Sequence, residues 1–184
     1  SADAPENTMA AFNLAWRHDA DAVECDIHLT KDGRIAVIHD SGTKRVAGAD
    51  LLIKDVSYGD LLALDVGSWK GSEWAGEKIP LLSELMASVP KGRKIYVEIK
   101  SEGMHMMSEF KSVVESSGLD SGQIVAISFS AETIALVREK LPSLTAYLLA
   151  GFEQDRISRA WSPDAEELIN RASACRAHGL DLYA

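Results

Sequence analysis

Two kinds of apolar pattern alternate along the chain, and they predict alternating strands and helices. Short runs rich in β-branched residues fit buried strands, whereas stretches with apolar residues every three to four positions fit amphipathic helices. Residues 8–18 show the second kind, because Met9, Phe12 and Trp16 fall on one helical face. The expected strands are 22–29, 35–39, 94–100, 123–129, 144–149 and 180–183, and the further helices are near 57–64 and at 81–88, 105–116, 131–141 and 163–178. This order is typical of an α/β domain with a largely parallel sheet.

The expected strands fit a TIM-type (β/α) barrel that is incomplete in this chain. A closed eight-stranded barrel would need one more strand before Ser1 and one after Ala184. The chain starts without a methionine and enters a turn-to-helix signal at once, while residues 179–184 open a strand and then stop. We therefore expect residues 1–184 to be a fragment of one barrel domain, with the first and last strands missing and a small loop insertion at about 41–79.

The connection at residues 30–33 fits a tight hairpin better than a parallel crossover. Asp32 and Gly33 form a dipeptide that favours two-residue hairpin turns. If these two residues are the turn, Asp26 lies directly opposite His39, and directly opposed residues point to the same face of a sheet. The expected register therefore brings a carboxylate and an imidazole together.

Acidic residues share one face of two expected strands. The period of two along residues 22–29 sends Glu24, Asp26 and His28 to the face opposite the apolar residues. The strand at 94–100 places Glu98 in the same way. Carboxylates held this close repel one another, and a divalent cation removes the repulsion. Three carboxylates with no partnering cysteine suit a hard cation, Mg²⁺ or Ca²⁺, better than zinc.

The plainer alternative for the acidic residues is a solvated face or ion pairs with nearby lysines, Lys94 and Lys100 among them. That alternative stays open for each carboxylate taken singly. It is less favoured for Glu24, Asp26 and Glu98 together, because each lies on the polar face of a strand whose other face is apolar.

His39 and Lys100 are the remaining candidates for chemistry. His39 closes an expected strand, and a histidine there is able to exchange protons near neutral pH, although a capping role is the alternative. Lys100 lies two residues after Glu98 on the same face, where its ammonium suits a phosphate oxygen, although an ion pair is the alternative. Three other histidines, His18, His105 and His178, are expected at the surface.

Composition narrows the classes of partner. The net charge of −9 argues against nucleic acid, because a polyanion would be repelled. No apolar run approaches the roughly 18 residues of a membrane span, and Cys25 and Cys175 have no metal-ligand spacing. We expect a small-molecule substrate and a cytoplasmic location, which a targeting signal upstream of Ser1 would change. The oligomeric state is open.

Five segments resemble, in order, the motifs of glycerophosphodiester phosphodiesterases. They are APENTMAAF at 4–12, VECDIHLTKDG at 23–33, VIHD at 37–40, IPLLSELM at 79–86 and VEIK at 97–100, and ISFS at 127–130 resembles the following strand. Each motif is weak alone, but five in one order are specific. The resemblance spans nearly the whole chain.

The resemblance implies a barrel enzyme that hydrolyses glycerophosphodiesters to glycerol 3-phosphate and an alcohol, with one divalent cation. The implied cation ligands are Glu24, Asp26 and Glu98, and His39 is implied as one of two catalytic histidines. Lys100 is implied to contact phosphate, and Glu6 and Asn7, at the mouth of the site, are implied to bind the substrate. The second histidine of the family belongs to a His-Arg-Gly motif, which would lie upstream of Ser1.

Two other functions compete with this interpretation. One is a related barrel phosphodiesterase acting on lysophospholipid or sphingomyelin, which an exposed apolar rim at residues 51–75 would favour. The other is a non-catalytic metal- or phosphate-binding relative. The sequence upstream of Ser1 would discriminate between an enzyme and a binding protein.

Overall fold

The computed structural model describes residues 2–100, 103–154 and 161–183. Its helices are α1 Met9–Arg17, α2 Lys44–Ala47, α3 Tyr58–Leu62, α4 Leu82–Ser88, α5 Gly103–Ser116, α6 Ala131–Lys140 and α7 Ala165–Ala174. Its strands are β1 Ala22–Leu29, β2 Ile35–Val37, β3 Lys94–Ile99, β4 Ile124–Ser128, β5 Thr145–Gly151, β6 Glu153–Gln154, β7 Trp161–Ser162 and β8 Gly179–Tyr183. Short 3₁₀ turns lie at Ile53–Asp55, Ser72–Trp74 and Ser121–Gln123.

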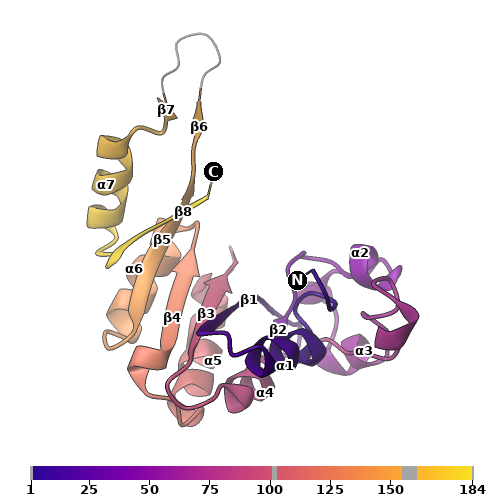
Figure 1. Cartoon of the computed structure of the whole chain (residues 1–184). Coiled ribbons are helices and arrows are strands. Elements are labelled where there is room, and N and C mark those ends of the chain that lie inside the picture. The colour runs from indigo at the N-terminus through magenta and orange to yellow at the C-terminus, as the bar shows by residue number, and fades with distance from the viewer. Residues whose placement is uncertain (1, 101–102, 155–160, 184) are drawn as a thin grey trace.

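One six-stranded sheet organises the chain, with strand order β2-β1-β3-β4-β5-β8. Strands β1, β3, β4, β5 and β8 run parallel to one another, and β2 is antiparallel to β1. Figure 1 shows α2 and α3 apart from the other helices at one end of the molecule, and β6 and β7 projecting at the other. A largely parallel sheet with intervening helices confirms the predicted α/β class and is consistent with an incomplete barrel.

The main hydrophobic core lies between the sheet and the helices on one of its faces. Alternate residues of β1 and β3, such as Cys25, Ile27 and Val97, are fully buried there against side chains of α4 and α5, among them Leu85 and Phe110. The opposite face of β4 and β5 carries only a small cluster around Ile127 and Leu149. The period of two therefore leaves the other face of β1 and β3 to polar residues.

A second, separate core lies beneath the segment that was expected as a loop insertion. It joins Ala36 and Ile38 of the hairpin to Val46, Ile53, Leu61, Val66 and Ile79. The segment is thus packed around its own apolar side chains, with α2 and α3 on its outside (Figure 1). It holds the residues after β2 against the end of β1.

The hairpin is antiparallel as predicted, but its predicted register is wrong by one residue. Leu29 lies opposite Ile35, and the Ile38 N–H donates to the Asp26 carbonyl at 2.9 Å, so Asp26 faces Ile38 and not His39. The turn has three residues, 31–33, because the Arg34 N–H donates to Thr30 Oγ1 at 2.9 Å and Gly33 takes a left-handed conformation with φ of 76°. The extra residue shifts every pair in the ladder.

Other differences from the expected elements are local. Strand β2 ends at Val37, before His39, and the short hairpin of β6 and β7 and helix α2 were not expected. Helix α7 is shorter than the predicted 163–178, because Asp164 caps its start and Arg176 leaves the helix with φ of 57°. The remaining strands and helices lie within two residues of the predicted bounds.

Gly67 lies where a side chain does not fit, and this gives a test of the packing of the second core. A Cβ built on Gly67 would overlap the Trp74 carbonyl oxygen and come within 2.9 Å of Glu77 Cβ. We expect Gly67→Ala to lower the free energy of unfolding by about 1–3 kcal/mol, as overpacking does. Gly59→Ala in α3 is the matched control, since a Cβ there would have Ser57 Oγ, at 3.6 Å, as its nearest contact. Urea unfolding measures both, and equal stability of the two variants would contradict the close packing.

Candidate active site

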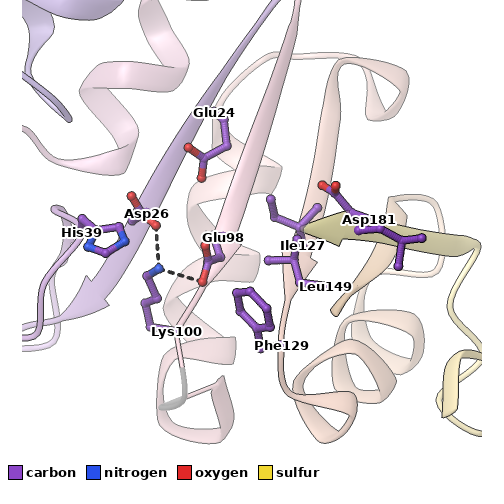
Figure 2. A pocket seen from close by; sticks show the side chains of 10 residues that line it. Glu24, Asp26, His39, Glu98, Lys100, Ile127, Phe129, Leu149 and Asp181 are labelled. Atoms are coloured by element: carbon purple, nitrogen blue, oxygen red, sulfur yellow. Dashed lines mark hydrogen bonds and ion pairs between the residues drawn. The ribbon is translucent and has the colours of Figure 1, made fainter. Parts of the chain in front are cut away.

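Three carboxylates converge on the face of the sheet that the helices leave open. Glu24 and Asp26 come from β1 and Glu98 from β3, and the parallel register sets Asp26 beside Glu98. Each of the three offers an oxygen within 4.8 Å of the others. Figure 2 shows their side chains pointing toward one another. The structure thus brings together all three residues that the sequence singled out as cation ligands.

Lys100 lies between two of these carboxylates. Its Nζ is 2.7 Å from Asp26 Oδ1 and 2.7 Å from Glu98 Oε1 (Figure 2). Burial lowers the pKa of Lys100 while the two carboxylates raise it, and the carboxylates prevail, so the pKa lies above its ordinary value. The ion-pair alternative raised for Lys100 therefore describes what this lysine contacts in the structure. Its contact with phosphate stays a prediction.

Asn7 fixes Asp26 from the other side. Asn7 Nδ2 donates to Asp26 Oδ2 at 2.8 Å, and the Asp26 N–H donates to Asn7 Oδ1 at 3.2 Å. Asn7 has a left-handed backbone with φ of 53°, in the turn that leads into α1. Asn7 thus orients Asp26, which is one of the proposed cation ligands. The resemblance had placed Asn7 at the mouth of the site, in a substrate-binding role.

Glu24, the first of the three carboxylates along the chain, has a raised pKa. Burial of the carboxyl group by surrounding protein raises its pKa to about 7, and the neighbouring charges of Asp26 and Glu98 add to this effect. Among the described residues, no side chain donates a hydrogen bond to the Glu24 carboxylate. A single lysine thus faces three acidic groups, and a divalent cation would compensate the remaining charge. The oxygen donors and their spacing suit such an ion.

His39 lies beside these carboxylates, although not through the predicted strand pairing. It lines one cavity of about 480 Å³ with Glu24, Asp26, Glu98 and Lys100. Its Nδ1 is 2.8 Å from Asp40 Oδ1, and its carbonyl oxygen is 3.1 Å from Nε2 of the buried His28. The residue follows the end of β2, where the second core holds its neighbour Ile38.

Glu6 does not point freely into the cavity, because an ion pair holds it. Arg45 Nη2 lies 2.5 Å from Glu6 Oε1, and Arg45 Nε lies 2.7 Å from Asp40 Oδ2. Sequence reasoning missed Arg45, and it noted Asp40 only as the residue after His39. The position of Asp40 directly after His39 could have marked it as a partner of the histidine. Nothing in the sequence marks Arg45 as a partner of Glu6, because the two lie 39 residues apart.

The opposite wall of the cavity is mainly apolar. Ile127, Phe129 and Leu149 line it at the ends of β4 and β5 (Figure 2). Leu182 and the acidic Asp181, both on β8, complete the lining. These residues were not predicted as site residues, since apolar strand residues look alike whether they face a core or a ligand. The cavity thus has an acidic, cation-suited side and a mainly apolar side.

The raised pKa of Glu24 predicts how stability depends on pH in the absence of divalent cations. Between the ordinary pKa of 4.5 and about 7, the folded chain binds more protons at this group than the unfolded chain does. The stability that Glu24 contributes to the fold is therefore fully present below pH 4.5 and is lost as the pH rises through about 7. The loss is smaller than for a fully buried group, because Glu24 is exposed to solvent.

Thermal melts of the chelated protein between pH 4.5 and 8 measure this effect. We expect Glu24→Gln to remove part of the decline seen in the wild type, whereas Glu115→Gln, at an exposed pair on α5, should leave it unchanged. Parallel curves for all three proteins would show that Glu24 titrates normally.

Comparison with known proteins agrees with the geometry. A model of the glycerophosphoryl diester phosphodiesterase family matches residues 1–180. A putative glycerophosphodiester phosphodiesterase of Bacillus subtilis, YhdW, is 36% identical over 143 residues, which cover 77% of this chain and 58% of the relative. Human lysophospholipase D GDPD1 is 34% identical over 116 residues, 60% of this chain and 37% of the human protein. The chain thus spans little more than half the length of the first of these relatives and less of the second.

Solved structures share the fold. A phosphodiesterase of Oleispira antarctica, in complex with the product sn-glycerol-3-phosphate, superposes with a TM-score of 0.87 at 25% identity, covering 99% of this chain and 71% of that one. The glycerophosphodiester phosphodiesterase of Agrobacterium tumefaciens superposes with a TM-score of 0.76 at 22% identity, covering 97% and 71%. The superpositions place the sheet in a TIM-type barrel fold. By the family match over nearly all its residues, the chain belongs to the glycerophosphoryl diester phosphodiesterase family.

Proposed function

We propose that the protein hydrolyses glycerophosphodiesters to glycerol 3-phosphate and an alcohol, with one divalent cation, Mg²⁺ or Ca²⁺, and histidine acid/base catalysis. The observation that carries the proposal is the convergence of Glu24, Asp26 and Glu98 with His39 around one cavity. The product complex of the Oleispira antarctica phosphodiesterase supports glycerol 3-phosphate as a product.

The residues around the cavity have different proposed roles, which follow from their chemistry. Glu24, Asp26 and Glu98 would hold the cation, which when bound neutralises charge on the phosphoryl oxygens. Asn7 orients Asp26, and Lys100 places a positive charge in the cavity for a phosphate oxygen. His39 takes a proton from the attacking oxygen or gives one to the departing alcohol oxygen. In the net reaction a water oxygen bonds to phosphorus and the ester P–O bond to the alcohol breaks.

We also propose that residues 1–184 act as one catalytic domain, in which the segment at 41–79 is an insertion that supports His39. Its separate core and its contact with the residues after β2 support this arrangement. A small-molecule substrate without nucleic acid, and a cytoplasmic location, remain predictions from the sequence. Among the described residues, no helix has the length and apolar character needed to span a bilayer.

A lysophospholipid is a second candidate substrate, and three observations favour it. Leu52, Leu62 and Trp69 are exposed by 46%, 44% and 43% in the segment where an apolar rim was named as the discriminating feature. The cavity wall at Phe129 and Leu149 is apolar, and a human relative is named a lysophospholipase D. An acyl chain would be expected to gain from such surfaces.

The complete protein, assayed with two substrates, tests both candidates. We expect release of choline and glycerol 3-phosphate from glycerophosphocholine with Mg²⁺ or Ca²⁺, and loss of activity on chelation. Lysophosphatidylcholine in the same assay would give choline and lysophosphatidic acid if the second candidate holds.

Glu98→Gln should lose most cation affinity in calorimetry, while Glu115→Gln keeps it. Undiminished activity of the metal-free protein would refute the requirement for a cation. Inactivity on both substrates would favour a binding protein.

His39 is expected to transfer protons, so its loss should not be rescued by added cation. We expect His39→Ala to lower kcat at least about a hundredfold, which corresponds to roughly 3 kcal/mol of barrier, with cation affinity and thermal stability retained. His105→Ala, at an exposed position on α5, is the control. The measurement is kcat at saturating cation, together with calorimetry and a melt. A kcat within a few-fold of the wild type would leave His39 a structural residue.

A further inference from the structure

Arg45 joins two segments that are far apart in the sequence. It lies on α2, where the buried Val46 beside it anchors the helix in the second core. Its guanidinium reaches Glu6 in the turn before α1, at 2.5 Å, and both oxygens of Asp40, at 2.7 and 3.1 Å. A planar fork with several donors suits this arrangement, because one guanidinium is able to bond two carboxylates at once.

Asp40 connects Arg45 to His39, because it contacts both side chains. The Arg45 hydrogen bond lowers the pKa of Asp40 to about 2 against the effect of partial burial, so Asp40 is an anion at neutral pH. An ionised carboxylate only accepts hydrogen bonds, so in the neutral ring His39 Nδ1 is the donor across the 2.8 Å contact. The Nε2 atom of His39 then carries the lone pair that proton transfer requires.

The imidazole depends on this contact for its orientation. The His39 side chain is 56% exposed, so packing does not hold it, and Asp40 is the side-chain partner of its ring among the described residues. Asp40 is itself 35% exposed, and Arg45 holds it through two oxygens. A neighbouring ion pair, between Lys44 of α2 and Asp50 beyond the end of that helix, has side chains 75% and 74% exposed and includes neither a cavity residue nor His39. It is an ordinary surface ion pair of little energetic value.

We propose that Arg45 is a positioning residue, which fixes the tautomer and direction of the His39 ring by clamping Asp40 against Glu6. This inference rests on the proposed function for its catalytic meaning. Glu6 accordingly supports Arg45 and not the substrate, in contrast to the substrate-binding role that the resemblance suggested.

Steady-state kinetics of the complete protein form the first test. We expect Arg45→Gln to lower kcat about tenfold to a hundredfold, the range found for outer partners that orient a histidine, with KM and calorimetric cation affinity within about threefold of the wild type. Arg45→Lys should retain an intermediate kcat, because an ammonium keeps the charge but cannot bond both carboxylates as the fork does. Lys44→Gln is the matched control on the same short helix and should match the wild type.

Nuclear magnetic resonance of the His39 ring is the second test, and it does not need turnover. At a pH where the ring is neutral, ¹⁵N shifts should report Nδ1 as protonated in the wild type and in Lys44→Gln. A mixture of tautomers is expected in Arg45→Gln. Thermal melts show that each variant is folded, and Arg45→Lys gives a second variant if Arg45→Gln is not.

The two tests separate the inference from the proposed function. If the wild type hydrolyses neither substrate, the proposed function fails, and the tautomer measurement still decides whether Arg45 orients the ring. The inference is overturned if Arg45→Gln keeps the wild-type tautomer and a kcat within twofold, or if Lys44→Gln changes as much as Arg45→Gln does.

Discussion

The parallel pairing of β1 with β3 is the constraint on which the rest of the site depends. It aligns Asp26 with Glu98 across neighbouring strands and leaves two like charges side by side on a partly buried surface. Backbone hydrogen bonds of the ladder hold these residues in place against their repulsion. Lys100, which lies 2.7 Å from each of these two carboxylates, balances only one of their two charges. Glu24 adds a third acidic group, which is why the geometry suits a divalent cation.

The same strands build the core and the site, and this explains why the carboxylates could be predicted. Cys25 and Ile27 are fully buried under the helices, so Glu24 and Asp26 must point to the other face. The alternation is strict and β1 has the predicted bounds, 22–29. For Glu98 the same period applied in β3. These side chains were fixed by local pattern, which a single sequence contains.

Features that depend on long-range contacts were less predictable. His39 was expected beside Asp26 through a two-residue turn, whereas the turn has three residues and His39 approaches the cavity from beyond the end of β2. Thr30 decided this, because its hydroxyl accepts the Arg34 N–H and closes the longer turn. Glu6 was placed near the site by resemblance, but its partner Arg45 lies in a segment without a recognisable strand or helix pattern. The hairpin of β6 and β7 has only two residues in each strand, too few to show a period.

The two halves of the site are therefore supported in different ways. Glu24, Asp26 and Glu98 project from hydrogen-bonded strands whose far faces are packed, so their positions change little unless the sheet itself changes. His39 lies past the end of a three-residue strand and is oriented by side chains, through Asp40 and Arg45. A substitution in the segment at 41–79 would therefore act on proton transfer before it acts on the carboxylates. Because that segment has its own core, its sequence is free to vary in the parts that do not hold α2 against the turn before α1, while the strands keep the cation-suited face unchanged.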